Sequence, residues 1–292
     1  MKRLIVFLVA VLFIVDAIHG QLVWKVSNKD SKTVSYLFGT HHLVDNNQIP
    51  NFDKILGLCD TTDLIVGEID MSVTLNQEAI LRHSQMNSMT LRDFVTSKEY
   101  KMLDNEFQSV LGVGMSVLGN LKPMALISLH QIRNYMKFEG LSMQPESIDE
   151  YIQSRAKDRG KDFLPLETVD EQLDLLMNTI PMERQAQILV ETIKNKNGNL
   201  KDIVQLQQTY LKGDINALQL LWKSDTSMTE LEKMKFSENR NLKWLEKIVG
   251  CIQNKSCFIA VGCMHLVGET GLISQLKLAG FDVEPVILAK LR

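Results

Sequence analysis

Apolar residues recur along this chain in two patterns: short runs, and longer stretches with helical spacing. The short runs are bounded by turn-forming polar residues and lie at 22–26, 33–38, 63–69, 162–167, 257–261 and 282–288. Runs of this length and composition predict buried β-strands. The polar segment 27–32 predicts a β-hairpin between the first two, and Pro165 confines its strand to a sheet edge or a strand end.

Helical spacing dominates the segments at about 72–160 and 169–249. Three glycines, at 112, 114 and 119, predict a helical hairpin in the first segment, with a substrate-gating loop as the alternative. In the second segment, one apolar helix face after Pro181 is formed by Met182, Ala186, Leu189 and Ile193. A further helix is predicted near 51–58, with Asn51 as its N-cap. A long later helix is indicated by the apolar positions Leu231, Met234, Leu242, Leu245 and Val249. The last helix is predicted near 269–279, with Gly280 as its stop.

The order of these elements predicts an α/β (α+β) fold. Strand runs alternate with helical stretches, which is typical of a mixed central sheet with helices packed on it. The helical segment at about 72–160 is a large insertion between two strands. We expect a single domain over residues 21–292, preceded by a separate segment at 1–20.

The segment 1–20 has the layout of a secretory signal peptide. Lys2 and Arg3 precede the apolar stretch 4–15, and small residues follow at Ala17 and Gly20. The stretch is shorter than the roughly 20 residues of a membrane span. We therefore expect an exported protein, periplasmic or secreted, that meets the membrane only through this signal. An uncleaved signal anchor is the alternative.

Charge and cysteine content narrow the class of protein. The net charge of -3 and the pI of about 6.1 argue against a nucleic-acid partner, because such proteins usually carry a basic surplus. Cys251 and Cys257 flank a short polar connection, which suggests a local disulfide in an exported chain, with two free thiols as the alternative. Cys263 is read as a buried small residue, with a metal ligand as the alternative.

Two segments share the pattern Gly-x-x-His, each directly after a predicted strand. The first runs from Gly39 to His42 and the second from Gly262 to His265. Glycine brings the main chain close to a ligand, and imidazole suits zinc and other transition metals. The repetition predicts a metal site with two histidine ligands; turn glycines with half-buried histidines are the alternative.

Two acids follow other predicted strands and complete this site. In open α/β sheets ligands bind beyond the carboxyl ends of the strands, so His42, His265, Glu68 and Glu167 are expected to converge. Two histidines and a carboxylate match the ligands of several catalytic metal sites, and the remaining carboxylate can act as general base. The alternatives are a salt-bridged or capping acid for Glu68 and a dipole-stabilised acid at a helix N-terminus for Glu167.

Other residues around these motifs have weaker assignments. Arg240 can hold a substrate carboxylate or an oxyanion, with an ordinary ion pair as the alternative. His41 is the alternative ligand to His42, although adjacent residues at a strand end point in opposite directions. His83 and His130 lie in helical stretches and are read as structural. The sequence lacks Gly-x-Ser-x-Gly, His-Glu-x-x-His, phosphate-loop and Cys-x-x-Cys motifs.

Taken in order, several segments resemble the TraB/PrgY/GumN family over about residues 22–288. They are 37–42, 66–69, 166–168 with 171–173, 238–241, 261–268 with Gly271-Leu272, and 278–283. The resemblance implies kinship with the Tiki metalloproteases and a relation to erythromycin-esterase and ChaN-like folds. It also implies a divalent metal held by paired Gly-x-x-His motifs and acids, here His42, His265, Glu68 and Glu167, with Arg240 nearby.

The sequence therefore predicts an exported metal-dependent hydrolase that acts on peptides. Its partner is a peptide or small-molecule substrate, and zinc, manganese and cobalt all accept histidine and carboxylate ligands. A non-catalytic protein that binds or sequesters peptides on the same fold is the rival interpretation. A hydrolase of non-peptide esters is a third, because the family is functionally broad.

Overall fold

The structure is a computed structural model that describes residues 22–28, 33–71, 77–288 and 291. The predicted signal peptide at 1–20 lies outside the described residues. Within the described residues, no helix combines the length and the apolar character that crossing a membrane requires.

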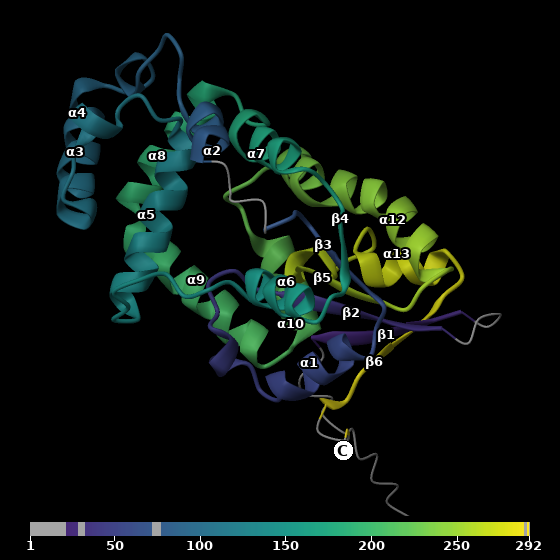
Figure 1. The fold of residues 1–292 in the computed structure, drawn as a ribbon. Helices are drawn as coiled ribbons and strands as arrows, with labels where there is room; N and C mark the ends of the chain where they lie inside the picture. The colour runs from purple at the N-terminus through teal and green to yellow at the C-terminus, as the bar shows by residue number, and fades with distance from the viewer. Residues whose placement is uncertain (1–21, 29–32, 72–76, 289–290, 292) are drawn as a thin grey trace, which may run out of the picture.

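The centre of the molecule is a six-stranded mixed sheet (Figure 1), as the sequence predicts. Its strands, in spatial order, are β4 (Asp162–Pro165), β3 (Leu64–Gly67), β5 (Cys257–Gly262), β2 (Val34–Thr40), β1 (Val23–Ser27) and β6 (Asp282–Pro285). The first four are parallel to one another, whereas β1 pairs antiparallel with both β2 and β6. The β1–β2 hairpin is confirmed, and Pro165 lies in the edge strand β4, where a missing N–H is tolerated.

Helices cover both faces of the sheet. Their bounds are α1 (Phe52–Asp60), α2 (Gln77–Ser84), α3 (Ser97–Leu111), α4 (Met115–Leu118), α5 (Pro123–Phe138), α6 (Ile148–Asp158), α7 (Val169–Asn178), α8 (Met182–Lys194), α9 (Lys196–Leu211), α10 (Ile215–Ser224), α11 (Glu230–Lys233), α12 (Asn239–Ile252) and α13 (Leu272–Leu278). Short 3-10 turns lie at Asn46–Gln48, Leu91–Asp93 and Cys263–His265, and a π-helical segment, Met234–Glu238, joins α11 to α12.

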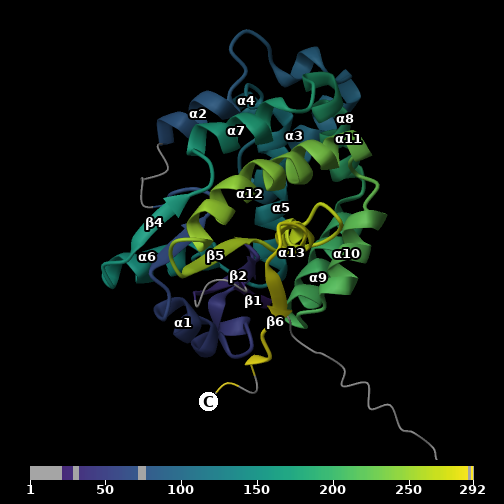
Figure 2. The same cartoon turned by 90° about the vertical axis from the view of Figure 1, so that its right-hand side faces the viewer.

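Alternation along the central strands separates two apolar cores. Phe38 and Phe258 pack with α1, α6 and α10 on one face, and Leu37 and Ile259 pack with α12 and α13 on the other. Figure 2 shows α12 and α13 on the side nearer the viewer. Because successive strand residues point to opposite faces, the short apolar runs serve both cores at once.

A third apolar core lies away from the sheet, among α3, α5 and α8. Leu189 and Ile193 on α8 face Phe107 and Leu126, so the predicted apolar face of α8 is buried there. The turn from α3 to α4 begins at Gly112, whose φ of 75° is left-handed, in agreement with the predicted hairpin. Figure 1 shows these helices at the side of the molecule opposite α13 and β6.

Some local predictions are wrong. Asn51 precedes α1 as expected, but its φ of 58° is left-handed and its side chain makes no capping hydrogen bond. On the long helix, Leu242 is 53% exposed, and the buried stripe runs through Asn241, Trp244 and Ile248 instead. Asn241 is polar, and its side-chain amide has hydrogen-bond partners in the interior.

The predicted Cys251–Cys257 disulfide is also wrong, because all four cysteines are free. The Cys257 thiol contacts the Lys255 carbonyl at 3.6 Å, and burial raises its pKa to about 12. Cys263 is buried, and burial raises its pKa to about 12 as well, which favours packing over metal ligation.

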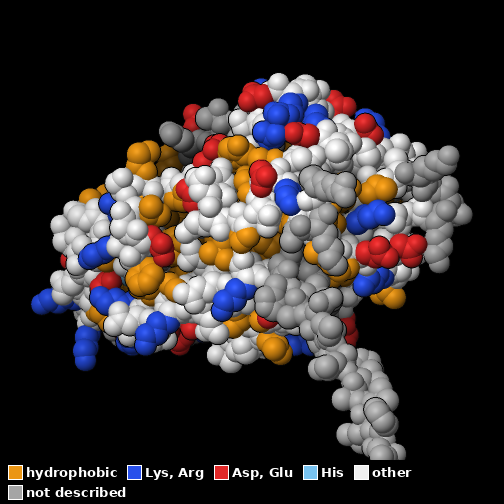
Figure 3. All heavy atoms as spheres, turned by 90° about the horizontal axis from the view of Figure 1, so that it is seen from below, with side chains coloured by type: hydrophobic (Ala, Val, Ile, Leu, Met, Phe, Trp, Pro, Cys, Tyr) orange, Lys and Arg blue, Asp and Glu red, His pale blue; other side chains and the backbone are white. Residues whose placement is uncertain are grey.

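The face seen in Figure 3 carries both signs of charge, with apolar side chains in small separate groups. This distribution agrees with the near-balanced composition of 32 basic and 35 acidic residues.

Candidate active site

Four candidate residues converge because their strands are parallel neighbours. Glu167, Glu68, His265 and His42 follow the carboxyl ends of β4, β3, β5 and β2 in that spatial order. The register aligns Gly67 of β3 with Pro165 of β4 and with Ala260 of β5, so the carboxyl ends of these three strands lie at one edge of the sheet. The predicted site thus lies where ligands bind in open α/β sheets.

Both motif glycines lie where a side chain would crowd a neighbour. A Cβ added to Gly39 would come within 2.8 Å of Leu266 Cδ1 and 3.1 Å of Cys263, in the second motif. A Cβ on Gly262 would approach Glu68 Oε1 at 3.2 Å. The first glycine therefore lets the two motifs pack together, and the second makes room for the acid.

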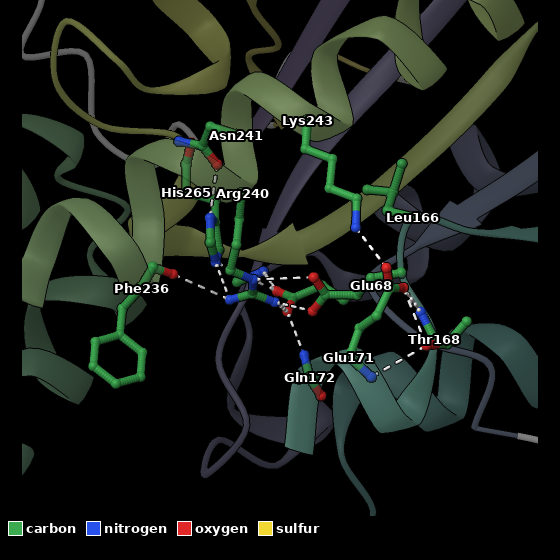
Figure 4. Close-up of polar contacts among 12 residues, drawn as sticks. Glu68, Leu166, Thr168, Glu171, Gln172, Phe236, Arg240, Asn241, Lys243 and His265 are labelled. Atoms are coloured by element: carbon green, nitrogen blue, oxygen red, sulfur yellow. Dashed lines mark hydrogen bonds and ion pairs between the residues drawn. The ribbon is translucent and has the colours of Figure 1, made fainter. Parts of the chain in front are cut away.

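Arg240, near the start of α12, is the centre of the polar cluster (Figure 4). Its Nη2 donates to Glu68 Oε2 at 2.7 Å and to Glu167 Oε1 at 2.5 Å, and its Nε donates to Glu167 Oε2 at 3.3 Å. Its Nη1 lies 3.0 Å from His265 Nε2. The guanidinium also stacks 4.4 Å from the Trp244 ring centre. One cation thus joins three of the predicted residues.

Glu68 is a buried carboxylate, and both of its oxygens accept hydrogen bonds. Oε1 accepts from the Gly262 N–H at 2.8 Å, and Oε2 accepts from Gln172 at 3.0 Å as well as from Arg240. Burial alone would raise its pKa, but the positive charges of His265, Arg240 and His42 at low pH and the Gly262 hydrogen bond lower it to about 2. Glu68 is therefore ionised at neutral pH.

His265 is held in one tautomer by Asn241. The Asn241 amide nitrogen donates to the carbonyls of His265 and Thr270, so its oxygen faces His265 Nδ1 at 2.7 Å. Because that oxygen only accepts, Nδ1 carries the proton and Nε2 presents a lone pair. Burial lowers the pKa of His265 to about 4, despite the charge of Glu68, so the ring is neutral at neutral pH.

His42 is anchored in the same way by a carboxylate. Its Nδ1 lies 3.0 Å from Asp149 Oδ2, and the other Asp149 oxygen accepts from Thr40 at 2.9 Å. Protein atoms packed around the ring displace water from it, and this desolvation alone would lower the pKa of His42. The hydrogen bond and charge of Asp149, together with the charge of Glu68, instead raise this pKa to about 9. The side chain is still 65% exposed, because it lines a cavity.

That cavity has a volume of about 790 Å³, and both His42 and Glu68 line it. Met71, Ile80 and Leu173 supply apolar surface, and Gln153 and Gln172 supply amides. The size suits a small molecule or a few residues of a peptide.

The three other histidines among the described residues have partners outside this cluster. His41 is buried, its ring centre lies 5.3 Å from that of Tyr210, and its Nδ1 accepts from the Leu43 N–H. His83 pairs with Asp170 at 2.9 Å, and His130 pairs with Glu106 at 3.0 Å. These contacts are consistent with structural roles.

The donor chemistry of the site fits a divalent metal. His42 and His265 each have Nδ1 bound to a side-chain oxygen, which leaves Nε2 as the coordinating atom, and Glu68 adds an ionised carboxylate. In the described part of the chain, however, no three His, Cys, Asp or Glu side chains lie close enough together to hold an ion. Among the three candidate ligands, His265 Nε2 and Glu68 Oε1 are 4.0 Å apart, and Arg240 contacts both residues.

Sequence reasoning missed the two residues that anchor the histidines. Asp149 lies in the first turn of α6, where an acid is explained by the helix dipole alone. Asn241 follows Arg240 directly, and nothing in its type indicates burial. Neither residue is near its histidine in sequence, so only the tertiary structure reveals the pairs.

The fold and the site together define a mixed α/β protein with a buried His–Glu–Arg cluster at the ends of parallel strands. A family model described as TraB/PrgY/gumN family matches residues 22–285, and the chain belongs to this family. Searches of curated proteins and of solved structures gave no match.

Proposed function

We propose that the chain is an exported, metal-dependent hydrolase that acts on peptides. The observation that carries the proposal is the shared anchoring of the two motif histidines. Each donates Nδ1–H to a side-chain oxygen, so Nε2 is the nitrogen through which each would bind a metal beside the Glu68 carboxylate. Anchors of this kind orient metal-binding histidines and raise their basicity.

The residues that would hold the metal are His42, His265 and Glu68. Zinc, manganese and cobalt all suit this mixture of nitrogen and oxygen donors. When bound, such a metal lowers the pKa of a water molecule to about 7 and polarises a substrate carbonyl.

The acids divide between two roles. A carboxylate whose pKa is about 2 is a poor proton acceptor at neutral pH, so Glu68 is better suited to hold a cation than to transfer protons. Glu167 remains for proton transfer. Arg240 contacts both acids and is suited to stabilise negative charge that develops on the substrate.

The rival function is peptide binding without turnover. It is favoured by the Arg240 contacts, because a guanidinium already neutralises the two carboxylates where a metal would lie. A cavity of about 790 Å³ serves a binding protein equally well. Export is part of both interpretations and rests on residues 1–20 of the sequence.

Metal analysis combined with a peptide-library cleavage assay tests the proposal. The parent protein should hold close to one divalent metal per chain and cleave peptides, and His42→Ala, His265→Ala and Glu68→Gln should each lose metal and activity. Glu167→Gln should keep metal but lose turnover. His83→Ala removes a histidine–aspartate pair outside the cluster and should change neither measurement.

Three results would redirect the proposal. Full metal content and full activity in both single histidine variants would refute the metal site. Metal binding with stoichiometric peptide capture and no products would favour the binding protein. Turnover of esters in a substrate screen, with no peptide cleaved, would identify an esterase.

A further inference from the structure

The lone pair of His265 Nε2 already has a partner. Asn241 fixes the proton on Nδ1, and a neutral imidazole has only one nitrogen left to accept a bond. That nitrogen lies 3.0 Å from Arg240 Nη1, and a guanidinium can only donate. Arg240 therefore occupies the orbital through which His265 would bind a metal.

The same side chain holds the carboxylate expected to share that metal. Arg240 Nη2 contacts Glu68 at 2.7 Å. Its two bonds to Glu167, from Nε and Nη2, do not involve His265. Glu167 can thus retain the guanidinium after its contacts with His265 and Glu68 have broken.

We propose that Arg240 is an internal cation that competes with the metal, and that it must release His265 Nε2 and Glu68 before a metal ion binds there. This inference rests on the proposed metal site and adds its regulation. Metal binding and the two Arg240 contacts are mutually exclusive states of one site. Glu167 is the residue that receives the displaced guanidinium.

Competition differs from simple charge repulsion in a way that substitutions reveal. Lysine keeps the positive charge but has one nitrogen in place of the guanidinium fork, so it cannot span two carboxylates and an imidazole. If Arg240 competes for His265, both Arg240→Lys and Arg240→Gln should bind metal more tightly. If only its charge matters, Arg240→Gln alone should gain affinity.

The test is calorimetric titration of the full chain with Zn²⁺ and with Mn²⁺. We expect Arg240→Lys to bind about tenfold more tightly or better than the parent, since one charge-assisted hydrogen bond no longer has to break. Arg155→Lys is the matched control, because Arg155 forms a two-point pair with Asp60 outside the cluster and should leave metal affinity unchanged.

Equal affinity in the parent and Arg240→Lys would overturn the competition while leaving the metal site intact. No binding by parent or variant would overturn both the competition and the proposed function. Nitrogen NMR of the parent protein is the second measurement and does not depend on a variant that folds. On metal addition, the coupling between His265 Nε2 and the Arg240 guanidinium should disappear, and its persistence with metal bound would overturn the inference.

Discussion

His42 and His265 end the same motif after two neighbouring parallel strands, yet they differ in charge. His265 is 7% exposed, is anchored by an amide, and has a pKa of about 4 because burial disfavours its charged form. His42 is open to the cavity, is anchored by the Asp149 carboxylate, and has a pKa of about 9. The motif determines where each ring lies, and the partner from a distant helix determines its protonation.

Exchanging the anchor of His265 should have the largest effect. In Asn241→Asp, a carboxylate replaces an amide that donates to the carbonyls of His265 and Thr270, so two buried acceptors lose their donor and face negative charge. We expect the free energy of unfolding to fall by about 3 kcal/mol or more. Urea unfolding measures this change.

Asn254→Asp is the control for that substitution, because the Asn254 amide bonds the Gly250 carbonyl at an exposed position on the same stretch of chain. Its unfolding free energy should change by less than about 0.5 kcal/mol. A similarly small change in Asn241→Asp would show that the amide does not anchor His265.

The second prediction concerns acid stability. The pKa of His265 is about 4 in the folded protein, against the ordinary histidine value of 6.5 in an unfolded chain. Between these values the unfolded state binds more protons, so stability rises with pH and is lost as the pH falls from about 6.5 to 4. Over this pH range, the protonation of His265 alone lowers the free energy of unfolding by about 3 kcal/mol.

His265→Gln should remove that share of the pH dependence. His41 has the same lowered pKa of about 4, so the variant will keep part of the dependence of stability on pH. The quantity to compare is therefore the difference in the free energy of unfolding between parent and variant from pH 7 to pH 4. Denaturant unfolding at pH 7, 6, 5 and 4 gives both curves. Parallel curves would contradict a neutral, buried His265.

Removing the charge that anchors His42 should have a moderate effect. In Asp149→Asn the carboxylate no longer supports the imidazolium, so the pKa of His42 should fall below 7 in an NMR titration. After correction for the proton that His42 must lose in the parent, metal affinity should fall by about 10- to 100-fold, as for other residues that orient metal ligands. Asp170→Asn, which changes the exposed His83 pair, should affect neither quantity.

How far sequence reasoning reaches differs between the fold and the site. Strand runs and Gly-x-x-His repeats are local signals, so the mixed sheet and the residues at its strand ends are predictable. The anchors Asp149 and Asn241 are not, because their roles arise from contacts over 107 and 24 positions of sequence. The error at Leu242 has the same origin, since the pair with His265 buries Asn241 and shifts the buried stripe by one residue.

The smallest expected effect is proton release on metal binding. With a pKa of about 9, His42 holds a proton on Nε2 at pH 7, and a metal must displace it, whereas the neutral His265 has none to lose. We therefore expect about one proton released per metal at pH 7, and an affinity that rises about tenfold per pH unit below 9. Calorimetry with Mn²⁺ in two buffers of different ionisation enthalpy, at pH 6.5 to 8, measures the number of protons released per metal ion.

In Asp149→Asn the proton release at pH 7 should fall well below one, because His42 is then already neutral in most molecules. Release of no protons by the parent would mean that His42 is not a ligand, and the two histidines would then divide into one metal ligand and one fixed acid.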